Sequence, residues 1–301
     1  MNAEKAVIFP GQGSQYKGMG YGLYKGLSRC RDIFDSIDSI LGFKLSKKCF
    51  EGQPYELKDT AIQQLAILAV SLAAFEAFKE KGISVDYVSG LSLGEYSCLY
   101  AAESLPLKDL VILVRERALA MQKAADLNSS TMLAVIGMDE ENVRLCAQEE
   151  DFYIANINAG GQTVISVAKS NKEIVRGLLQ AHSARVIELE VSGGFHSPFM
   201  DSARKSLESV ISGLDFKSAK IPIVSNVTAK PHTSALEIRE NLLKQLTMPV
   251  LWKACVEFMV DEGVETFYEV GPSKVLKGLM RKISSGSKVV NIEKIEDIDQ
   301  V

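Results

Sequence analysis

One serine lies in a sequence pattern that can make it a nucleophile. Gly90-Leu91-Ser92-Leu93-Gly94 matches G-x-S-x-G and falls between a predicted strand over residues 85–89 and a predicted helix over residues 95–102. The glycines permit a sharp turn, which exposes the hydroxyl at the start of a helix, where the helix dipole favours developing negative charge. Because the pattern is short, an ordinary strand-to-helix turn with a capping serine explains it equally well.

A serine nucleophile needs a base, and the chain has three histidines. His232 lies in a predicted turn, where we expect a solvated side chain. His182 follows a predicted helix and is expected to cap its carbonyl end. His196 follows a predicted strand and two glycines, which allow the backbone to approach a site closely. Considered alone, His196 is better explained as a hydrogen-bonded turn residue.

Two further segments have residues that bind anions. Gly11-Gln12-Gly13 follows the first predicted strand, but Tyr16 stands where the dinucleotide-binding pattern G-x-G-x-x-G needs its third glycine. This leaves a plain turn, or backbone N–H groups directed at an oxyanion. Arg115 and Arg117 lie in a predicted apolar helix over residues 106–125, and the pattern alone favours the solvated face for both.

Composition excludes several classes of protein. Hydrophobic residues make up 47% and charged residues 24% of 301 residues, which is too apolar for a disordered chain. The balance of 34 basic and 38 acidic side chains gives no basic excess, so we expect no nucleic-acid partner. The five cysteines are scattered without a CxxC or Cys/His cluster, so we expect neither a disulfide framework nor a metal site.

No membrane association is expected either. The most apolar stretch, residues 65–75, is about half of the ~20 residues that span a bilayer, so it is interpreted as a buried core helix. The apolar run over residues 6–9 is too short for the hydrophobic part of a signal peptide. We therefore expect a soluble, cytoplasmic protein.

Strands and helices are predicted to alternate along the chain, which indicates an α/β protein with a parallel sheet. Between about residues 131 and 191 the order changes to β-α-β-β-α-β, which is typical of a ferredoxin-like unit. The predicted organisation is a large domain of residues 1–128 and 198–301, interrupted by a small domain of residues 129–197.

Motifs along nearly the whole chain resemble those of the malonyl-CoA:acyl carrier protein transacylase family. Each motif is weak alone, and their occurrence in this order makes the resemblance strong. They are Ile8-Phe-Pro-Gly-Gln-Gly-Ser-Gln15, Gly90-Leu-Ser-Leu-Gly-Glu-Tyr96, Arg117-Ala-Leu-Ala-Met-Gln122, Asn156-Ile-Asn-Ala-Gly-Gly-Gln162, Gly193-Gly-Phe-His-Ser197, Gln245-Leu-Thr-Met-Pro249 and Tyr268-Glu-Val-Gly-Pro272.

The resemblance implies a hydrolase-like α/β core and a role for each site residue. Ser92 would be the nucleophile and His196 its general base, oriented by the backbone carbonyl of Gln245. The backbone N–H groups of Gln12 and Leu93 would form the oxyanion hole.

The resemblance also implies the substrates. Arg117 would bind the free carboxylate of a malonyl group, and Gln63 falls at a substrate-pocket position. The acyl donor would be malonyl-CoA and the acceptor acyl carrier protein, in fatty-acid or polyketide synthesis. No cofactor is implied, because the CoA thioester is itself a substrate, and a monomer is expected.

The chain departs from the family pattern at several positions. The family usually has His at Leu91 and Ala at Gly194, and Pro is common at Gly160 and Gln64. Leu91 leaves the serine and its turn intact and is expected to alter one wall of the pocket. Phe195-His196-Ser197 matches the malonyl-selective members.

Two other functions compete with acyl transfer. A hydrolase would use water in place of the carrier thiol, but its acid and histidine would follow the serine late in the chain, and a related proofreading hydrolase would lack the arginine. A non-catalytic docking protein would not need both Ser92 and His196.

A basic cluster near the C-terminus is either a carrier-binding patch or a solvated helix face: Lys274, Lys277, Arg281 and Lys282.

Overall fold

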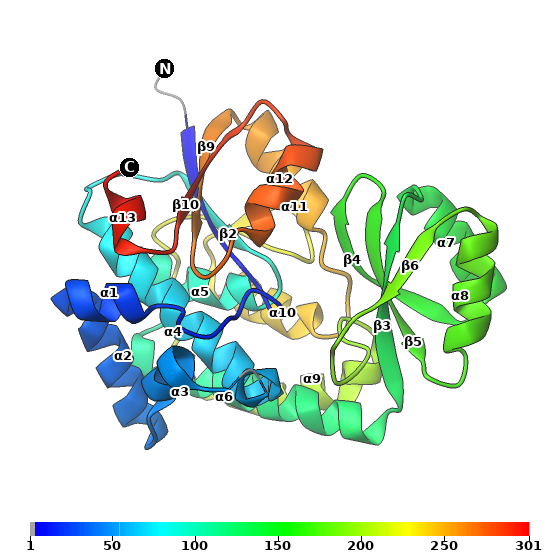
Figure 1. The fold of residues 1–301 in the computed structure, drawn as a ribbon, viewed down its shortest axis with the longest axis horizontal. Helices are drawn as coiled ribbons and strands as arrows, with labels where there is room; N and C mark the ends of the chain where they lie inside the picture. The colour runs from blue at the N-terminus through cyan, green and yellow to red at the C-terminus, as the bar shows by residue number, and fades with distance from the viewer. Residues whose placement is uncertain (1–3, 54, 301) are drawn as a thin grey trace.

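A computed structural model describes residues 4–53 and 55–300 and contains two separate β-sheets (Figure 1). The larger sheet has the strand order β10-β9-β1-β2-β7-β8, in which all neighbours are parallel except β7 and β8. Its strands are β1 (Glu4–Phe9), β2 (Tyr87–Gly90), β7 (Ile223–Val224), β8 (Pro231–His232), β9 (Val264–Val270) and β10 (Lys288–Ile292). The predicted α/β fold with a parallel sheet is therefore confirmed.

Helices cover both faces of this sheet, because its central strands are apolar on both sides. Successive residues of β1 point to opposite faces, so Val7 and Phe9 pack in one core cluster and Ala6 and Ile8 in another. The first cluster includes α4 (Thr60–Lys79) and the second includes α11 (Trp252–Asp261) and α12 (Val275–Ile283).

Helix α4 is the core helix predicted from the apolar stretch. The Asp59 side chain caps it by accepting the N–H groups of Ala61 and Ile62, both at 3.0 Å. Among the described residues, α4 is the one helix long and apolar enough to cross a membrane, but 89% of its most apolar window is buried inside the protein. Burial on all sides explains why it carries no amphipathic pattern.

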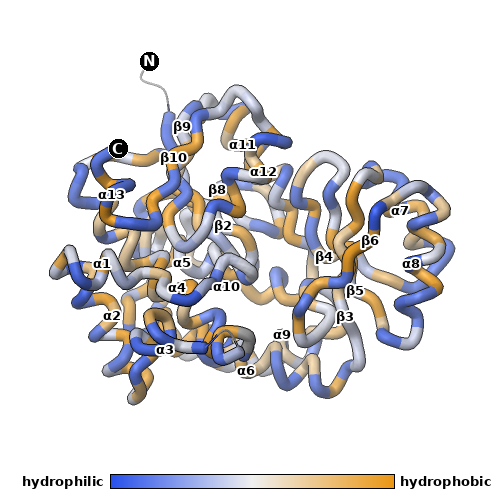
Figure 2. The backbone as a smooth tube through the Cα atoms, in the orientation of Figure 1, coloured by the Kyte–Doolittle hydropathy of each residue, from blue (hydrophilic) through white to orange (hydrophobic). Residues whose placement is uncertain are grey.

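The smaller sheet is antiparallel, with the order β4-β5-β3-β6. Helices α7 and α8 cover one side of it and alternate between hydrophobic and hydrophilic segments (Figure 2). The elements are β3 (Ser130–Ile136), α7 (Glu140–Glu149), β4 (Phe152–Ala159), β5 (Gln162–Ala168), α8 (Lys172–Ala181) and β6 (Arg185–Glu188). This is the predicted ferredoxin-like order; the domain boundaries at residues 129 and 197 stay a prediction.

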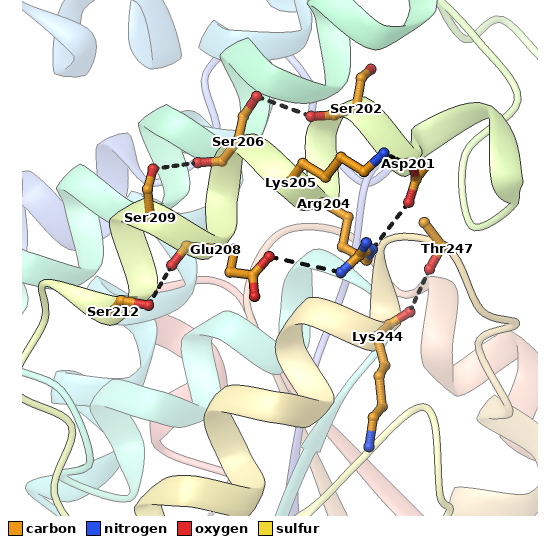
Figure 3. A network of polar contacts seen from close by, with 10 residues as sticks. All are labelled: Asp201, Ser202, Arg204, Lys205, Ser206, Glu208, Ser209, Ser212, Lys244 and Thr247. Atoms are coloured by element: carbon orange, nitrogen blue, oxygen red, sulfur yellow. Dashed lines mark hydrogen bonds and ion pairs between the residues drawn. The ribbon is translucent and has the colours of Figure 1, made fainter.

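The long helix α6 (Leu107–Leu127) runs from the helices beside the large sheet to β3 of the small sheet (Figure 1). It packs against α4 and against α9 (Asp201–Ser212). The outer face of α9 is a solvated polar surface on which Asp201, Arg204, Lys205 and Glu208 form ion pairs of 2.8–3.9 Å (Figure 3).

Several predicted elements differ from the structure. Helix α5 (Leu93–Ala101) begins directly after Ser92 rather than at residue 95, and α11 begins at Trp252 rather than at residue 249. His232 is not a solvated turn residue, because it lies in β8 and its Nε2 is 2.9 Å from Thr228 Oγ1. The elements that the sequence analysis did not predict are α1 (Tyr21–Gly26), α2 (Ser28–Leu41), α3 (Leu45–Glu51), the 3-10 helix η1 (Glu56–Lys58), β8, β10 and α13 (Ile295–Ile298).

Candidate active site

Ser92 occupies a sharp turn between the end of β2 and the start of α5. Its backbone has φ 52° and ψ −102°, a conformation that non-glycine residues rarely adopt. The flanking glycines make the turn possible, because a Cβ on Gly90 would overlap the backbone of Gly94, and a Cβ on Gly94 would overlap the Phe9 carbonyl. The strained turn therefore places the Ser92 side chain at the N-terminus of α5.

The Ser92 side chain is hydrogen-bonded to His196. Ser92 Oγ is 2.7 Å from His196 Nε2, and His196 Nδ1 is 2.7 Å from the carbonyl oxygen of Gln245. A carbonyl only accepts, so the Nδ1 of neutral His196 carries the proton and its Nε2 is free to accept the Ser92 hydroxyl proton. His196 also has a positive φ of 54°, so both members of the pair are held in strained conformations.

Burial and a neighbouring charge keep the imidazole neutral. His196 is 4% exposed. Its burial and the positive charge of Arg117 lower the pKa of His196 to about 4, although the hydrogen bond to the Gln245 carbonyl acts in the opposite direction. A neutral imidazole is the form that can accept a proton from serine.

Asn226 fixes the turn that carries Ser92. The Ser92 N–H donates to Asn226 Oδ1 at 2.8 Å, and Asn226 Nδ2 donates to the Gly90 carbonyl at 2.8 Å. Asn226 is fully buried and follows β7, the strand next to β2. One carboxamide therefore satisfies backbone groups on both sides of the strained residue.

A buried carboxylate connects Asn226 to Gln245. Glu95 Oε2 accepts the Asn226 N–H at 3.1 Å and the Gln245 side-chain Nε2 at 2.6 Å. Burial raises the pKa of Glu95 to about 7, while these hydrogen bonds and the charge of Arg117 act to lower it. Gln245 Nε2 also donates to the Ser92 carbonyl at 3.1 Å, so Gln245 contacts both members of the Ser92–His196 pair.

Arg117 points into this network and is 1% exposed. Its Nη2 donates to Ser92 Oγ at 3.2 Å and to Gln245 Oε1 at 3.3 Å, and its Nη1 donates to Gln64 Oε1 at 2.6 Å. Its Nε is buried without a hydrogen-bond partner. No carboxylate among the described residues lies within ion-pair distance of the guanidinium; Glu95 acts on its charge from farther away, with the Gln245 carboxamide between the two groups.

Two backbone N–H groups close to Ser92 are left without hydrogen-bond partners among the described residues. Leu93 is the first residue of α5, so its N–H has no partner within the helix. Gln12 lies in the loop after β1, which approaches the Ser92 turn so closely that a Cβ on Gly11 would overlap the Leu91 carbonyl. Neither N–H makes a hydrogen bond to another described residue.

A cavity of about 340 Å³ opens between the ends of β1 and β2 and the small sheet. This volume is typical of a site for a small molecule. The cavity is lined by Gln12, Gln63 and Ser92 of the large domain's elements and by residues of the small sheet, Met132, Asn156 and Val164. His196 lines the cavity as well.

The structure brings together the residues predicted for the site, and their catalytic and binding roles stay predictions: Ser92, His196, Gln245, Gln12, Leu93, Arg117 and Gln63. The favoured solvated position of Arg117 is wrong for that residue, whereas the Arg115 side chain is 39% exposed. Sequence analysis missed Asn226 and Glu95. An asparagine directly after a strand of the parallel sheet is a signal that would have pointed to Asn226, because such strand ends meet at one edge.

Comparison with known proteins agrees with this geometry. The acyl transferase domain family matches residues 7–296. The chain belongs to this family. Over 98% of its length it is 41% identical to a malonyl CoA-acyl carrier protein transacylase of Bacillus subtilis, covering 95% of that protein. A Staphylococcus aureus protein of the same name is 36% identical over 98% of this chain and 97% of its own length.

Solved structures with the same fold as this acyl transferase include two malonyltransferases. The malonyl-transacylase PlMCAT, in complex with the type II PKS acyl-carrier protein AntF, has a TM-score of 0.95 and 34% identity, covering 99% of this chain and 98% of that one. An acyl-carrier-protein-S-malonyltransferase from Bartonella henselae has a TM-score of 0.94 and 36% identity over the same shares. The family and the hydrolase-like core predicted from the motifs are confirmed.

The departures of this acyl transferase from the family pattern have local explanations. The Leu91 side chain forms part of the cavity wall. A Cβ on Gly194 would lie 2.8 Å from Phe199 and 3.1 Å from both Ser130 and Ser166, so other side chains fill the space of the usual alanine. A Cβ on Gly160 would have no atom of the described residues within 4 Å, so the space around this turn leaves room for a side chain.

Proposed function

We propose that the chain transfers the malonyl group of malonyl-CoA to the phosphopantetheine thiol of an acyl carrier protein through an ester on Ser92. One observation carries the proposal: the buried, unpaired guanidinium of Arg117 lies 3.2 Å from the hydroxyl that His196 can deprotonate. A malonyl group is a thioester with a carboxylate, and the two groups match these two functions.

In the first half-reaction, Ser92 Oγ attacks the thioester carbonyl while its proton passes to His196 Nε2. The carbonyl oxygen becomes an oxyanion, which the N–H groups of Gln12 and Leu93 stabilise; each such donor contributes about 10²–10³ in rate. The C–S bond then breaks, CoA leaves with the proton held by His196, and the malonyl ester remains on Ser92.

The second half-reaction runs the same steps with another thiol. His196 takes the proton of the carrier thiol, the sulfur attacks the ester carbonyl, and Ser92 Oγ leaves and regains the proton. Donor and acceptor use one site in turn, so the kinetics are ping-pong. The ion pair between the malonyl carboxylate and Arg117 holds the acyl group in one orientation between the two steps.

The proposed partners follow from this chemistry and from the relatives. The PlMCAT structure holds an acyl-carrier protein together with its malonyl-transacylase. The reaction needs no cofactor, because every proposed step uses side chains and backbone groups of the chain. We further propose that the protein acts as a cytoplasmic monomer in fatty-acid or polyketide synthesis.

The test follows the seryl ester directly. Wild-type protein mixed with malonyl-CoA should gain the mass of one malonyl group, and addition of holo acyl carrier protein should move that mass to the carrier. Ser92→Ala should form no ester, and His196→Ala should slow its formation by a comparable order, because such residues act as a unit.

Each alternative predicts another result. A hydrolase would release free malonate and leave the carrier unmodified, and a docking protein would form no ester at all. A stable malonyl adduct on the Ser92→Ala protein would refute the assignment of Ser92.

A further inference from the structure

Gln64 is the closest hydrogen-bonding partner of Arg117. It lies early in α4 and is fully buried, and its Oε1 accepts from Arg117 Nη1 at 2.6 Å. The other contacts of the guanidinium to hydrogen-bond acceptors, Ser92 Oγ and Gln245 Oε1, are longer, at 3.2 and 3.3 Å. Gln64 is therefore the group that fixes one edge of the guanidinium.

The carboxamide of Gln64 is oriented by a second contact. Its Nε2 donates to Met121 Sδ at 3.6 Å, and Met121 lies four residues, about one helical turn, after Arg117 on α6. Rotating the amide by 180° would direct its NH₂ group at the guanidinium, and two donors would then face each other. Arg117 and Met121 together thus keep the oxygen of Gln64 directed at the guanidinium.

The Gln64 oxygen satisfies an N–H group without cancelling the positive charge. A carboxylate at the same position would form a buried ion pair with Arg117 at this short distance, and the guanidinium would then have little charge left for a second anion. The cation–π contact with Tyr96, whose ring centroid is 4.7 Å from the guanidinium carbon, also leaves the net charge unchanged.

We propose that Gln64 is a specificity-determining residue that orients Arg117 through a neutral acceptor and so reserves its charge for the carboxylate of the acyl group. The proposal rests on the proposed function of the site. It assigns to Gln64 a positioning role that acts through Arg117, without contact to the substrate.

Two substitutions of Gln64 test separately the orientation and the charge of the Arg117 guanidinium. In Gln64→Glu the new carboxylate pairs with Arg117, so kcat/KM for malonyl-CoA should fall about 100-fold while that for acetyl-CoA stays within about twofold. In Gln64→Met the side chain keeps its length but loses the acceptor, so kcat/KM for malonyl-CoA should fall about tenfold. The measurement is the rate of Ser92 ester formation with each thioester.

The controls isolate the Gln64–Arg117 contact. Gln180→Glu adds the same charge on the exposed face of α8 and should leave both rates unchanged. In an Arg117→Ala background, Gln64→Met should cause no further loss with malonyl-CoA, because the partner through which it acts is gone. Thermal unfolding of each variant shows whether the fold is retained.

The outcomes distinguish failure of the Gln64 proposal from failure of the proposed function. The proposal would be overturned if the ratio of kcat/KM for malonyl-CoA to that for acetyl-CoA in both Gln64 variants equalled the wild-type ratio. The proposed function would still stand in that case, provided that the wild type itself prefers malonyl-CoA. A wild-type protein without that selectivity would refute the proposed function and its extension together. If Gln64→Glu does not fold, the ratio measured for Gln64→Met decides alone.

Discussion

Replacing Arg117 by alanine should abolish selectivity for malonyl-CoA while leaving the serine reactive. The guanidinium is 1% exposed, so a carboxylate bound to it has exchanged water for a single charged partner. The hydrogen bonds from Ser92 to His196 and from His196 to the Gln245 carbonyl are made without atoms of the guanidinium, so the acyl-transfer chemistry itself should persist.

The size of the effect follows from this burial. Removing one partner of a buried charge pair costs ~3–5 kcal/mol, because the other charge is left unpaired. At ~1.36 kcal/mol per tenfold, kcat/KM for malonyl-CoA should fall by about 10²–10⁴. Acetyl-CoA has no carboxylate, so its kcat/KM should change by less than about tenfold, the contribution of the 3.2 Å bond from Arg117 to Ser92 Oγ.

The assay compares kcat/KM for malonyl-CoA and acetyl-CoA in the wild type and three variants. Arg117→Lys keeps the charge but not the planar fork that reaches Gln64 and Gln245 together, so it should recover only part of the activity. Arg115→Ala is the matched control, because Arg115 lies on the same helix, is 39% exposed and pairs with Glu116. Its rates should equal those of the wild type.

One result would refute this reasoning. Equal losses for both thioesters in Arg117→Ala would show that the arginine supports the fold of the site rather than the recognition of a carboxylate. The malonyl assignment would then rest on the relatives alone.

Three further predictions concern pH, the carrier and stability. With a pKa of about 4, His196 is neutral above about pH 5, so kcat/KM for ester formation should show no loss of the histidine base down to that pH and should fall below about pH 4. Charge reversal of Lys274 and Lys277 should raise KM for the carrier protein without slowing ester formation; unchanged carrier kinetics would make this basic cluster a solvated helix face. Glu269 accepts two N–H groups at the start of α12, both at 2.8 Å, so at low pH Glu269→Gln should lower the free energy of unfolding in urea by about 1–2 kcal/mol. Burial raises the folded-state pKa of Glu269 to about 7, above its value of 4.5 in the unfolded chain. Its contribution to stability is therefore greatest at low pH and is lost as pH rises through about 7. The free energy of unfolding of the Glu269→Gln variant should not show this decrease with pH.

Local patterns were sufficient to predict the order of most elements. The small sheet was predictable because each of its strands and helices has its own apolar pattern and lies close to its partners in sequence. Ser92 and His196 were predictable because short motifs surround them. Strand β10 was not predicted, because its five residues become a strand only by pairing with β9 in the tertiary structure.

The contacts that tune the site were not predictable in the same way. Gln63 and Gln64 are adjacent, yet only Gln64 contacts Arg117 while Gln63 lines the cavity. The rotation of α4 decides between them, and a helix that is buried on all sides has no polar stripe from which its rotation can be read. The role of Asn226 could not be predicted for a similar reason, because its partners are far away in sequence: Gly90 ends strand β2 and Ser92 lies in the turn after it.

The strained turn at Ser92 has a consequence for the order in which the molecule becomes active during synthesis. The groups that hold the turn come late in the chain: Asn226 is 134 residues after Ser92, and Gln245 is 153 residues after it. At ribosomal speeds this separation corresponds to roughly 8–30 s. A nascent chain that has presented only the G-x-S-x-G segment therefore lacks the acceptor for the Ser92 N–H and the carbonyl that orients His196. Under the proposed mechanism, the serine of an incomplete chain is an ordinary alcohol that does not react with acyl-CoA, and it becomes a nucleophile only when α10 (Ala235–Gln245) has docked.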